Sequence, residues 1–287
     1  MLTPDPPVLC FFHRGCLDGR AAAATVRRAH PKARCIPCQY GDRAPAVLGA
    51  RVYVVDFAFD PQTMRRLERE AASICWIDHH RTHRATHAEL GWGLFAEDEC
   101  AAMLTWHALF PDESPPAVLK HIRARDLWRW EHPDSRAVVA ALDDLTNDEH
   151  PEEIFAHDCG DLRRHGAPIV RRTDRRVRRI ARRGMRISEP YGLHGVSALA
   201  VNSATHISEV GELVYTGAED GGLGLDLAIV FFMRPDGRWV HSLRSYRVDC
   251  ERIAANRGGG GHPAAACYVA DEPFPASADN LGGPTGD

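Results

Sequence analysis

Short apolar runs alternate with helical segments in the first eighty residues, and this alternation constrains the fold more than any other feature of the sequence. The runs cover residues 8–12, 36–40, 51–55 and 73–77. Segments of helical character, 20–29 and 61–72, separate them. Strand–helix–strand repetition at this spacing predicts a parallel, doubly wound α/β sheet, whose ligands gather beyond the carboxyl ends of the strands.

Side chains that bind metal ions follow these runs. The candidates are His13, Asp18, Asp56, the triplet Asp78-His79-His80, and Asp126 after a predicted helix over 117–125. A lone Asp at a strand end is usually a cap, and a lone His is more often a surface or core residue. Several of them at successive strand ends favour a metal site. Carboxylate and imidazole ligands suit a divalent ion such as Mn²⁺, and two ions about 3.5–4 Å apart can activate water.

The second half predicts further helices and a smaller sheet. Helices are expected over 99–110 and 136–146, then a long helical stretch interrupted at 166–168 and continuing to 183. Strands are expected over residues 196–202, 225–233 and 238–245, the last two joined by the turn Pro235-Asp236-Gly237. The predicted domains are a metal-binding domain (1–150), a helical connector (151–188), a smaller α/β domain with a mixed sheet (189–272) and a flexible tail (273–287).

A glycine-rich segment near the C-terminus can approach an anion closely through its backbone N–H groups. It contains Gly259, Gly260 and Gly261, followed by His262, which can add a donor. Arg244 ends a predicted strand and could pair with a phosphate through two hydrogen bonds. The alternatives are a flexible loop for the glycines and an ordinary surface position for Arg244.

Four segments together resemble the DHH phosphoesterase family with its C-terminal DHH-associated domain. They are His13-Arg14-Gly15-Cys16-Leu17-Asp18, Val54-Val55-Asp56, Asp78-His79-His80 and Gly259-Gly260-Gly261-His262 with the following Pro-Ala-Ala-Ala. The resemblance implies cleavage of phosphodiester or phosphoanhydride bonds with Mn²⁺ or a similar ion, Co²⁺ or Mg²⁺ being alternatives. It implies these metal ligands: His13, Asp18, Asp56, His79 and Asp126. His80 would face the phosphate, and Asp78 would orient the histidines.

The first segment departs from the family pattern. Many members carry two acidic residues two positions apart, where this chain has Cys16 and Asp18. A thiolate prefers softer metals. One metal position is therefore weaker than usual, or the ion is not Mn²⁺, or water replaces the ligand.

The composition is that of a globular protein, with 44% hydrophobic and 26% charged residues and a net charge of −4. Nine cysteines, an odd number, and an N-terminus without a secretory pattern predict a cytoplasmic protein. No apolar run reaches membrane-spanning length, so no membrane partner is expected. Arginines crowd residues 163–186; they predict either a solvated connector helix or a basic wall for nucleic acid.

These observations predict a metal-dependent phosphodiesterase that hydrolyses short oligonucleotides or linear or cyclic dinucleotides to mononucleotides. The substrate partner would be a nucleotide or short nucleic acid, and a homodimer is left open. One alternative is a single-strand 3′/5′ exonuclease, although no extra nucleic-acid-binding domain is apparent. Another is a non-catalytic nucleotide sensor in which Cys16 marks an altered metal site. An inorganic pyrophosphatase is less favoured, because the glycine-rich segment indicates a nucleotide-sized ligand.

Overall fold

The computed structural model describes residues 5–274, and the chain forms two compact units that divide between Val170 and Arg171. The part of the predicted tail at 275–287 lies outside the described residues. Among residues 5–274, no helix combines the length and the apolar character needed to cross a bilayer.

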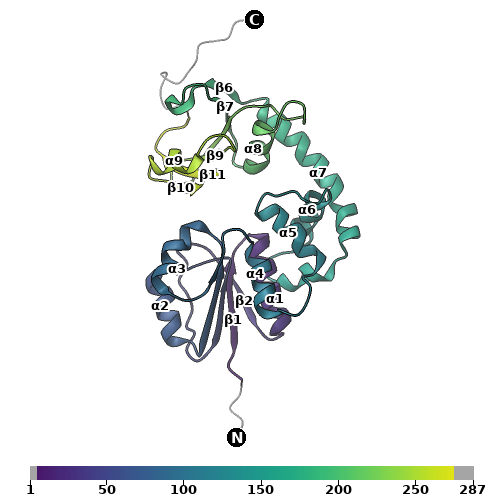
Figure 1. Ribbon diagram of the computed structural model, residues 1–287, viewed down its shortest axis with the longest axis vertical. Coiled ribbons are helices and arrows are strands. Elements are labelled where there is room, and N and C mark those ends of the chain that lie inside the picture. Colours follow the sequence, from purple (N-terminus) through teal and green to yellow (C-terminus); the bar gives the residue numbers. More distant parts are fainter. Residues whose placement is uncertain (1–4, 275–287) are drawn as a thin grey trace, which may run out of the picture. The chain divides into compact units, whose positions relative to one another are not determined.

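The first unit is built on a five-stranded parallel sheet with the strand order β2-β1-β3-β4-β5 (Figure 1). Its strands are β1 (Val8–His13), β2 (Arg34–Cys38), β3 (Arg51–Val55), β4 (Ser73–Asp78) and β5 (Leu94–Phe95). Its helices are α1 (Leu17–Ala29), α2 (Pro61–Glu70), α3 (Arg84–Leu90), α4 (Ala101–Leu109), α5 (Ala117–Asp126) and α6 (Ser135–Leu145). The predicted doubly wound α/β fold of this part is confirmed.

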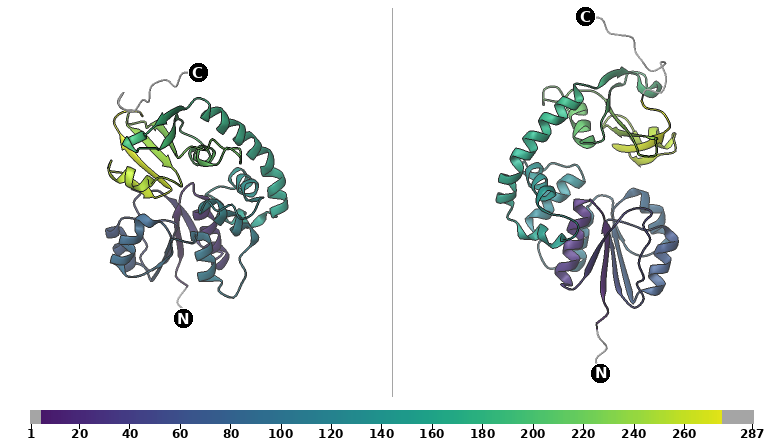
Figure 2. Two further views of the ribbon diagram at one scale, coloured as in Figure 1. Left: turned by 45° about the horizontal axis from the view of Figure 1, so that its top comes forward. Right: turned by 180° about the vertical axis from the view of Figure 1, so that it is seen from behind.

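Apolar side chains on both faces of this sheet explain its layers. One core packs sheet residues such as Phe12 and Val55 against α1, α4, α5 and α6. The other packs Phe11, Val54 and Trp76 against α2. Figure 2 shows the helices on the two sides of the sheet. Strands buried on both faces read as continuous apolar runs, which is why the sequence located them.

The second unit contains a six-stranded mixed sheet with the order β10-β11-β9-β8-β7-β6. Its strands are β6 (Met185–Ser188), β7 (Ser197–Asn202), β8 (Leu227–Met233), β9 (Trp239–Arg244), β10 (Gly260–His262) and β11 (Ala265–Ala270). Strands β7 and β8 are parallel, and the other neighbours are antiparallel. Helix α8 (Ile207–Tyr215) contributes Val210 and Val214 to the core on one face, and α9 (Cys250–Ala255) contributes Ile253 to the core on the other. The predicted mixed sheet is confirmed.

Helix α7 (Cys159–Ala181) corrects one prediction, because it continues through Pro168 where the sequence predicted a break. Proline removes one hydrogen bond from a helix and costs about 3 kcal/mol. Here the helix is held at both ends: Leu162 is buried in a core of the first unit, and Val177 and Ala181 are buried in the second. This packing, which local sequence cannot show, outweighs the local preference for a break.

Candidate metal centre

The centre lies at the carboxyl edge of the parallel sheet, where the strand order changes direction between β1 and β3. In sheets with the order 2-1-3-4-5, this switch point is where ligands bind. His13 is the last residue of β1, and Asp56 directly follows β3. His79 and His80 directly follow the neighbouring strand β4. The topology thus delivers three predicted ligands and one predicted catalytic histidine to one place.

Asp56 occupies the centre of this cluster. Its side chain is fully buried, and its backbone adopts a left-handed conformation with a φ of 54°, which is uncommon outside glycine. One carboxylate oxygen, Oδ2, lies 3.9 Å from His13 Nδ1. The other, Oδ1, lies 3.3 Å from His79 Nε2 and 3.7 Å from His80 Nδ1. The two oxygens therefore face different imidazoles, as a carboxylate between two ions would.

His79 lies among three carboxylates. Its Nε2 atom is 3.8 Å from Asp18 Oδ2, 3.3 Å from Asp56 Oδ1 and 3.5 Å from Asp126 Oδ2. Burial lowers the pKa of His79, but these carboxylates outweigh burial and raise the pKa to about 10. Burial raises the pKa of Asp126 to about 6. Carboxylates that hold a proton on His79 this tightly can hold a metal ion in its place.

Asp18 is held by the start of another helix. It lies in the first turn of α1, which begins at Leu17, three residues before the predicted start at residue 20. Its oxygens accept hydrogen bonds from the backbone N–H groups of Ala101 (2.7 Å) and Ala102 (3.0 Å), at the start of α4. Burial and then Asp126 and Asp56 raise its pKa well above the usual value. The α4 contact fixes the direction of the carboxylate.

Several buried polar atoms in this cluster have no hydrogen-bond partner within residues 5–274. They are His13 Nδ1, both oxygens of Asp56, His79 Nε2 and Asp126 Oδ2. Buried polar groups are nearly always paired in proteins, so a cluster of unpaired ones requires an explanation. Among the described residues, four sets of ligand atoms lie within 4.8 Å of one another. Two of them share no residue and could each hold an ion: Asp18, His79 and Asp126, and His13, Cys16 and Asp56. The residues present fit a divalent-metal centre.

Asp78 fixes the histidines beside the centre. Its Oδ1 accepts hydrogen bonds from the backbone N–H groups of His79 (2.7 Å) and His80 (3.0 Å) and from His80 Nδ1 (2.8 Å). Its Oδ2 lies 2.5 Å from His83 Nδ1. Burial alone would raise the pKa of Asp78, but the bonds with His80 and His83 hold it far below its usual value. His83 was not predicted from the sequence, although its spacing of three residues from His80 was an available signal.

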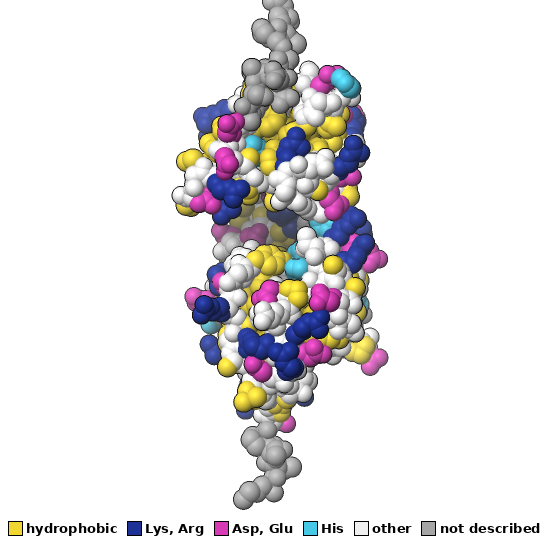
Figure 3. All heavy atoms as spheres, turned by 90° about the vertical axis from the view of Figure 1, so that its left-hand side faces the viewer, with side chains coloured by type: hydrophobic (Ala, Val, Ile, Leu, Met, Phe, Trp, Pro, Cys, Tyr) yellow, Lys and Arg dark blue, Asp and Glu magenta, His cyan; other side chains and the backbone are white. Residues whose placement is uncertain are grey.

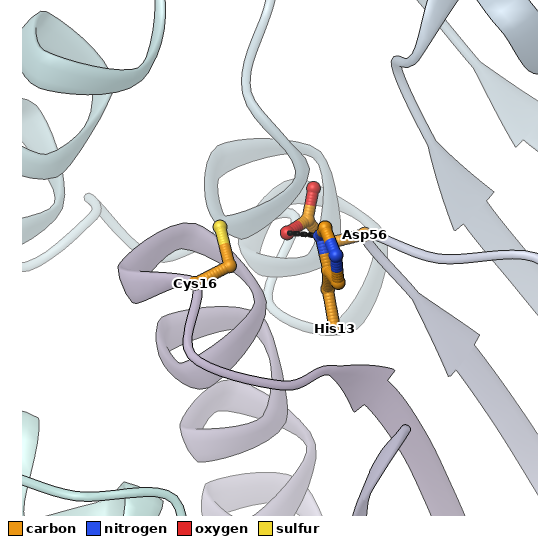
Figure 4. Close-up of side chains that lie close together, drawn as sticks. All are labelled: His13, Cys16 and Asp56. Atoms are coloured by element: carbon orange, nitrogen blue, oxygen red, sulfur yellow. Dashed lines mark ion pairs between the residues drawn. The ribbon is translucent and has the colours of Figure 1, made fainter. Parts of the chain in front are cut away.

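Cys16 joins the cluster from the turn after β1. Figure 4 shows that His13 and Cys16, from the end of β1 and the turn after it, lie close to Asp56, which follows β3. Burial, followed by the charges of Asp56 and Asp18, raises the pKa of the Cys16 thiol well above its usual value. The acidic residue expected at this position by the family pattern is thus replaced by a group that can still reach the centre.

An exposed aromatic ring lies beside the histidines. Tyr40 is 53% exposed, and its ring centroid lies 5.3 Å from that of Phe57 and 5.4 Å from that of His13. Trp128 and Trp130 contact each other with ring centroids 5.2 Å apart. Tyr40 was not singled out in the sequence, because a single tyrosine after a strand carries no pattern.

The predicted substrate-binding residues form a separate group in the second unit. Arg244 is paired in register with Ala265, which is paired with His262. Residues paired directly across strands point to the same face, so Arg244 and His262 flank Ala265 on one side of the sheet. The stem of Arg244 packs over Gly211 of α8, where an added Cβ would lie 2.5 Å from the Arg244 Cβ.

The glycine-rich segment is an edge strand, not the flexible loop that the sequence left open. Gly260–His262 forms β10, antiparallel to β11. A Cβ on Gly259 would lie 2.1 Å from the carbonyl oxygen of Cys267, so this glycine permits close strand packing. Around Gly260 no atom lies within 4 Å of an added Cβ. Of the three predicted glycines, Gly260 is therefore the one with open space where a side chain would lie.

No family model matches the chain. It is similar to the uncharacterized protein R106 of Acanthamoeba polyphaga mimivirus, with 24% identity over 288 residues. The match covers 90% of this chain and 66% of that protein, so the chain spans about two thirds of its relative's length.

Three solved structures share the fold. The DHH domain of a member of a ribosomal-protein family gives a TM-score of 0.54 at 13% identity, covering 93% of this chain and 83% of that one. A pGpG-specific phosphodiesterase from Vibrio cholerae gives 0.50 at 15%, covering 92% and 93%. An exopolyphosphatase-related protein from Bacteroides fragilis gives 0.50 at 12%, covering 96% and 89%. These likenesses establish the fold and are consistent with the DHH phosphoesterase family that the motifs indicated.

Proposed function

We propose that this protein is a metal-dependent phosphodiesterase that hydrolyses short oligonucleotides or linear or cyclic dinucleotides to mononucleotides. The observation that carries the proposal is the set of buried ligand atoms around Asp56 that have no hydrogen-bond partner among the described residues. His13, Asp18, Asp56, His79 and Asp126 would hold divalent ions, of which Mn²⁺, Co²⁺ and Mg²⁺ are the candidates. Such ions, when bound, polarise a phosphoryl group and activate water.

His80 is suited to act on the phosphate. Burial lowers its pKa, but the hydrogen bond to Asp78 and the charges of Asp56 and Asp78 outweigh burial and raise it. Because Nδ1 lies 2.8 Å from a carboxylate oxygen, Nδ1 carries a proton and donates a hydrogen bond to Asp78. A protonated ring then also presents Nε2–H, which can donate to a phosphoryl oxygen as charge develops there.

Arg244 and His262 of the second unit are suited to bind one end of a nucleotide. The guanidinium of Arg244 can bind a phosphate, and His262 can donate from the neighbouring position on the same sheet face. Two strand spacings of about 4.8 Å separate their backbones, which matches a small ligand. The exposed ring of Tyr40 offers a surface on which a base can stack. The specificity for pGpG that is stated for the Vibrio phosphodiesterase supports this substrate class.

The charge on one face of the first unit bears on the exonuclease alternative (Figure 3). Figure 3 shows basic and acidic side chains mixed on the face of the first unit that carries α2 and α3. Arg65 pairs with Glu89 and Arg66 with Glu70. A processive enzyme needs a continuous basic track for a long backbone, and this face does not provide one.

The test is hydrolysis of a panel of linear dinucleotides, cyclic dinucleotides and oligoribonucleotides of graded length, with Mn²⁺, Co²⁺ and Mg²⁺ compared. We expect the highest rate on the shortest substrates and its loss in Asp56→Asn. Asp60→Asn is the matched control, because Asp60 caps α2 by accepting from the Thr63 N–H and lies outside the centre. Absence of turnover on every member of the panel with every metal would refute the proposal.

A further inference from the structure

Cys16 is the one side chain of the cluster whose chemistry differs from the rest. It precedes α1 at the N-cap position, where Ser, Thr, Asp or Asn usually bonds a backbone N–H, but its side chain makes no such bond. Its sulfur lies within 4.8 Å of ligand atoms of His13 and Asp56 (Figure 4). The thiol therefore lies beside the ligand atoms of the centre.

The turn that carries Cys16 is fixed from both sides. Arg14 Nη2 donates to the carbonyl oxygen of Pro37 (3.1 Å) and to Asp42 Oδ2 (3.0 Å). The N–H of Gly15 donates to Asp148 Oδ2 at 2.8 Å. Anchors on both sides hold the sulfur in place before any ion binds, which is the preorganisation that a ligand position requires.

The neighbouring ligand atoms are buried and unpaired. Neither oxygen of Asp56, which is fully buried, has a hydrogen-bond partner within residues 5–274, and the same holds for His13 Nδ1. In tetrahedral coordination, Zn–S and Zn–N bonds of about 2.3 and 2.0 Å place the sulfur and the nitrogen about 3.5 Å apart. The ligand atoms of Cys16, His13 and Asp56 lie within 4.8 Å of one another, so they would have to approach each other by up to about 1.3 Å to share one ion.

We propose that Cys16 is a thiolate metal ligand, and that with His13 and Asp56 it forms a soft position selective for Zn²⁺ or Co²⁺ over Mn²⁺ and Mg²⁺. The inference rests on the metal centre of the proposed function and assigns its metal preference. On binding, the S–H proton is released to the buffer and a sulfur–metal bond forms. The N-terminus of α1 favours the resulting negative charge.

The second position has a different ligand chemistry. Asp18, His79 and Asp126 offer only oxygen and nitrogen, which suit Mn²⁺ and also Zn²⁺. The centre would then be asymmetric, with a thiolate position bridged through Asp56 to a carboxylate-rich one. The alternative is that Cys16 is a packing thiol, in which case its removal leaves metal preference unchanged.

The test is titration of the metal-free, full-length protein with Co²⁺, monitored by near-ultraviolet absorption. A Co²⁺–thiolate bond produces a charge-transfer band that oxygen and nitrogen ligands do not. We expect the band in the wild type and in Cys38→Ser, and its absence in Cys16→Ser and Cys16→Asp. Cys38 is the matched control, because it is paired with His13 in register but its thiol donates to the Ile36 carbonyl and it belongs to none of the candidate ligand sets.

Competition dialysis of Co²⁺ against Mn²⁺ supplies a second measurement. Loss of an outer partner of a ligand costs about 10–100-fold in metal affinity, so loss of the ligand should cost at least as much. The Co²⁺/Mn²⁺ preference should fall at least about tenfold in Cys16→Asp, whose carboxylate keeps a ligand in place. Circular dichroism verifies that both variants fold.

The outcomes separate this inference from the proposed function. An unchanged band and an unchanged preference in Cys16→Ser and Cys16→Asp would overturn the thiolate ligand, even if dinucleotides are hydrolysed. A band that depends on Cys16, in a protein that hydrolyses no member of the substrate panel, would support the ligand and refute the phosphodiesterase.

Discussion

Replacing Asp56 by Asn should have opposite effects on the stability of the metal-free and the metal-loaded protein. The carboxylate is fully buried and neither oxygen accepts a hydrogen bond from a described residue, so its compensation comes from the nearby imidazoles, and it shares His79 with Asp18 and Asp126. A buried polar group without a partner costs about 1–3 kcal/mol, and more when it is charged. Asn also tolerates the left-handed backbone at this position, so the substitution adds no conformational strain.

The expected magnitudes follow from these terms. Without metal, Asp56→Asn should raise the free energy of unfolding by about 1–3 kcal/mol. For a unit of this size that corresponds to a rise in Tm of about 2–4 °C per kcal/mol. With an ion at a hundred times its Kd, the wild type should gain about 2.7 kcal/mol, and the variant should lose most of this gain.

The assay is thermal or urea unfolding of both proteins in EDTA and in saturating Mn²⁺ or Co²⁺. The order of stabilities should reverse between the two conditions, and Asp60→Asn should show no reversal. A variant less stable than the wild type in EDTA would refute the argument that the imidazoles compensate the buried charge of Asp56 only in part. Equal stabilisation of both proteins by metal would refute its assignment as a ligand.

Three further predictions concern the same centre. Gly19→Ala should change the free energy of unfolding little, because the gain of about 1 kcal/mol in helix propensity is offset by crowding of the neighbouring atoms. The variant should bind metal more weakly in isothermal titration, because the added Cβ lies 3.0 Å from Asp56 Oδ2. Asp78→Asn should lower kcat more than metal affinity, because the His80 ring loses its charged partner while remaining in place; a pH–rate profile should show a lower His80 pKa. The free energy of unfolding without metal should rise as the pH falls from about 10 toward 6.5, because His79 binds its proton more tightly in the folded protein than in the unfolded chain. It should rise again from about pH 6 toward 4, because the pKa of Asp126 is also higher in the folded protein. Urea unfolding in EDTA across this pH range checks both signs.

The sequence predicted the parallel sheet because its strands are buried on both faces and therefore read as continuous apolar runs. It predicted which residues follow those strands for the same reason. It could not show that α7 continues through Pro168, because the packing of Leu162 and Val177 at the two ends of that helix is tertiary. Short elements such as β6 and α9 were missed, because four to six residues contain too little periodicity.

The candidate site was likewise predictable from the sequence only in part. Positions after strands could be proposed from the sequence, since the carboxyl ends of parallel strands share one edge. The contacts of Asp18 with the α4 backbone and of Asp78 with His83 join segments that the sequence does not relate by pattern. Nor could the sequence show that β10 is an edge strand, because a run of glycines is equally compatible with a loop.

Asp56 carries several energetic costs that a fold with no ligand at this position would not need. Its carboxylate is buried without a hydrogen-bond partner among the described residues. Its φ of 54° costs of order 1–2 kcal/mol in backbone strain for a non-glycine residue. A Cβ added at Gly19 would lie 3.0 Å from that carboxylate, so glycine at this helical position leaves room for it at the cost of helix propensity. Local departures of this kind are expected at functional sites and are offset elsewhere. An ion that binds both oxygens would recover the electrostatic part of the cost, which is why metal binding and folding of the first unit should be thermodynamically linked at this one side chain.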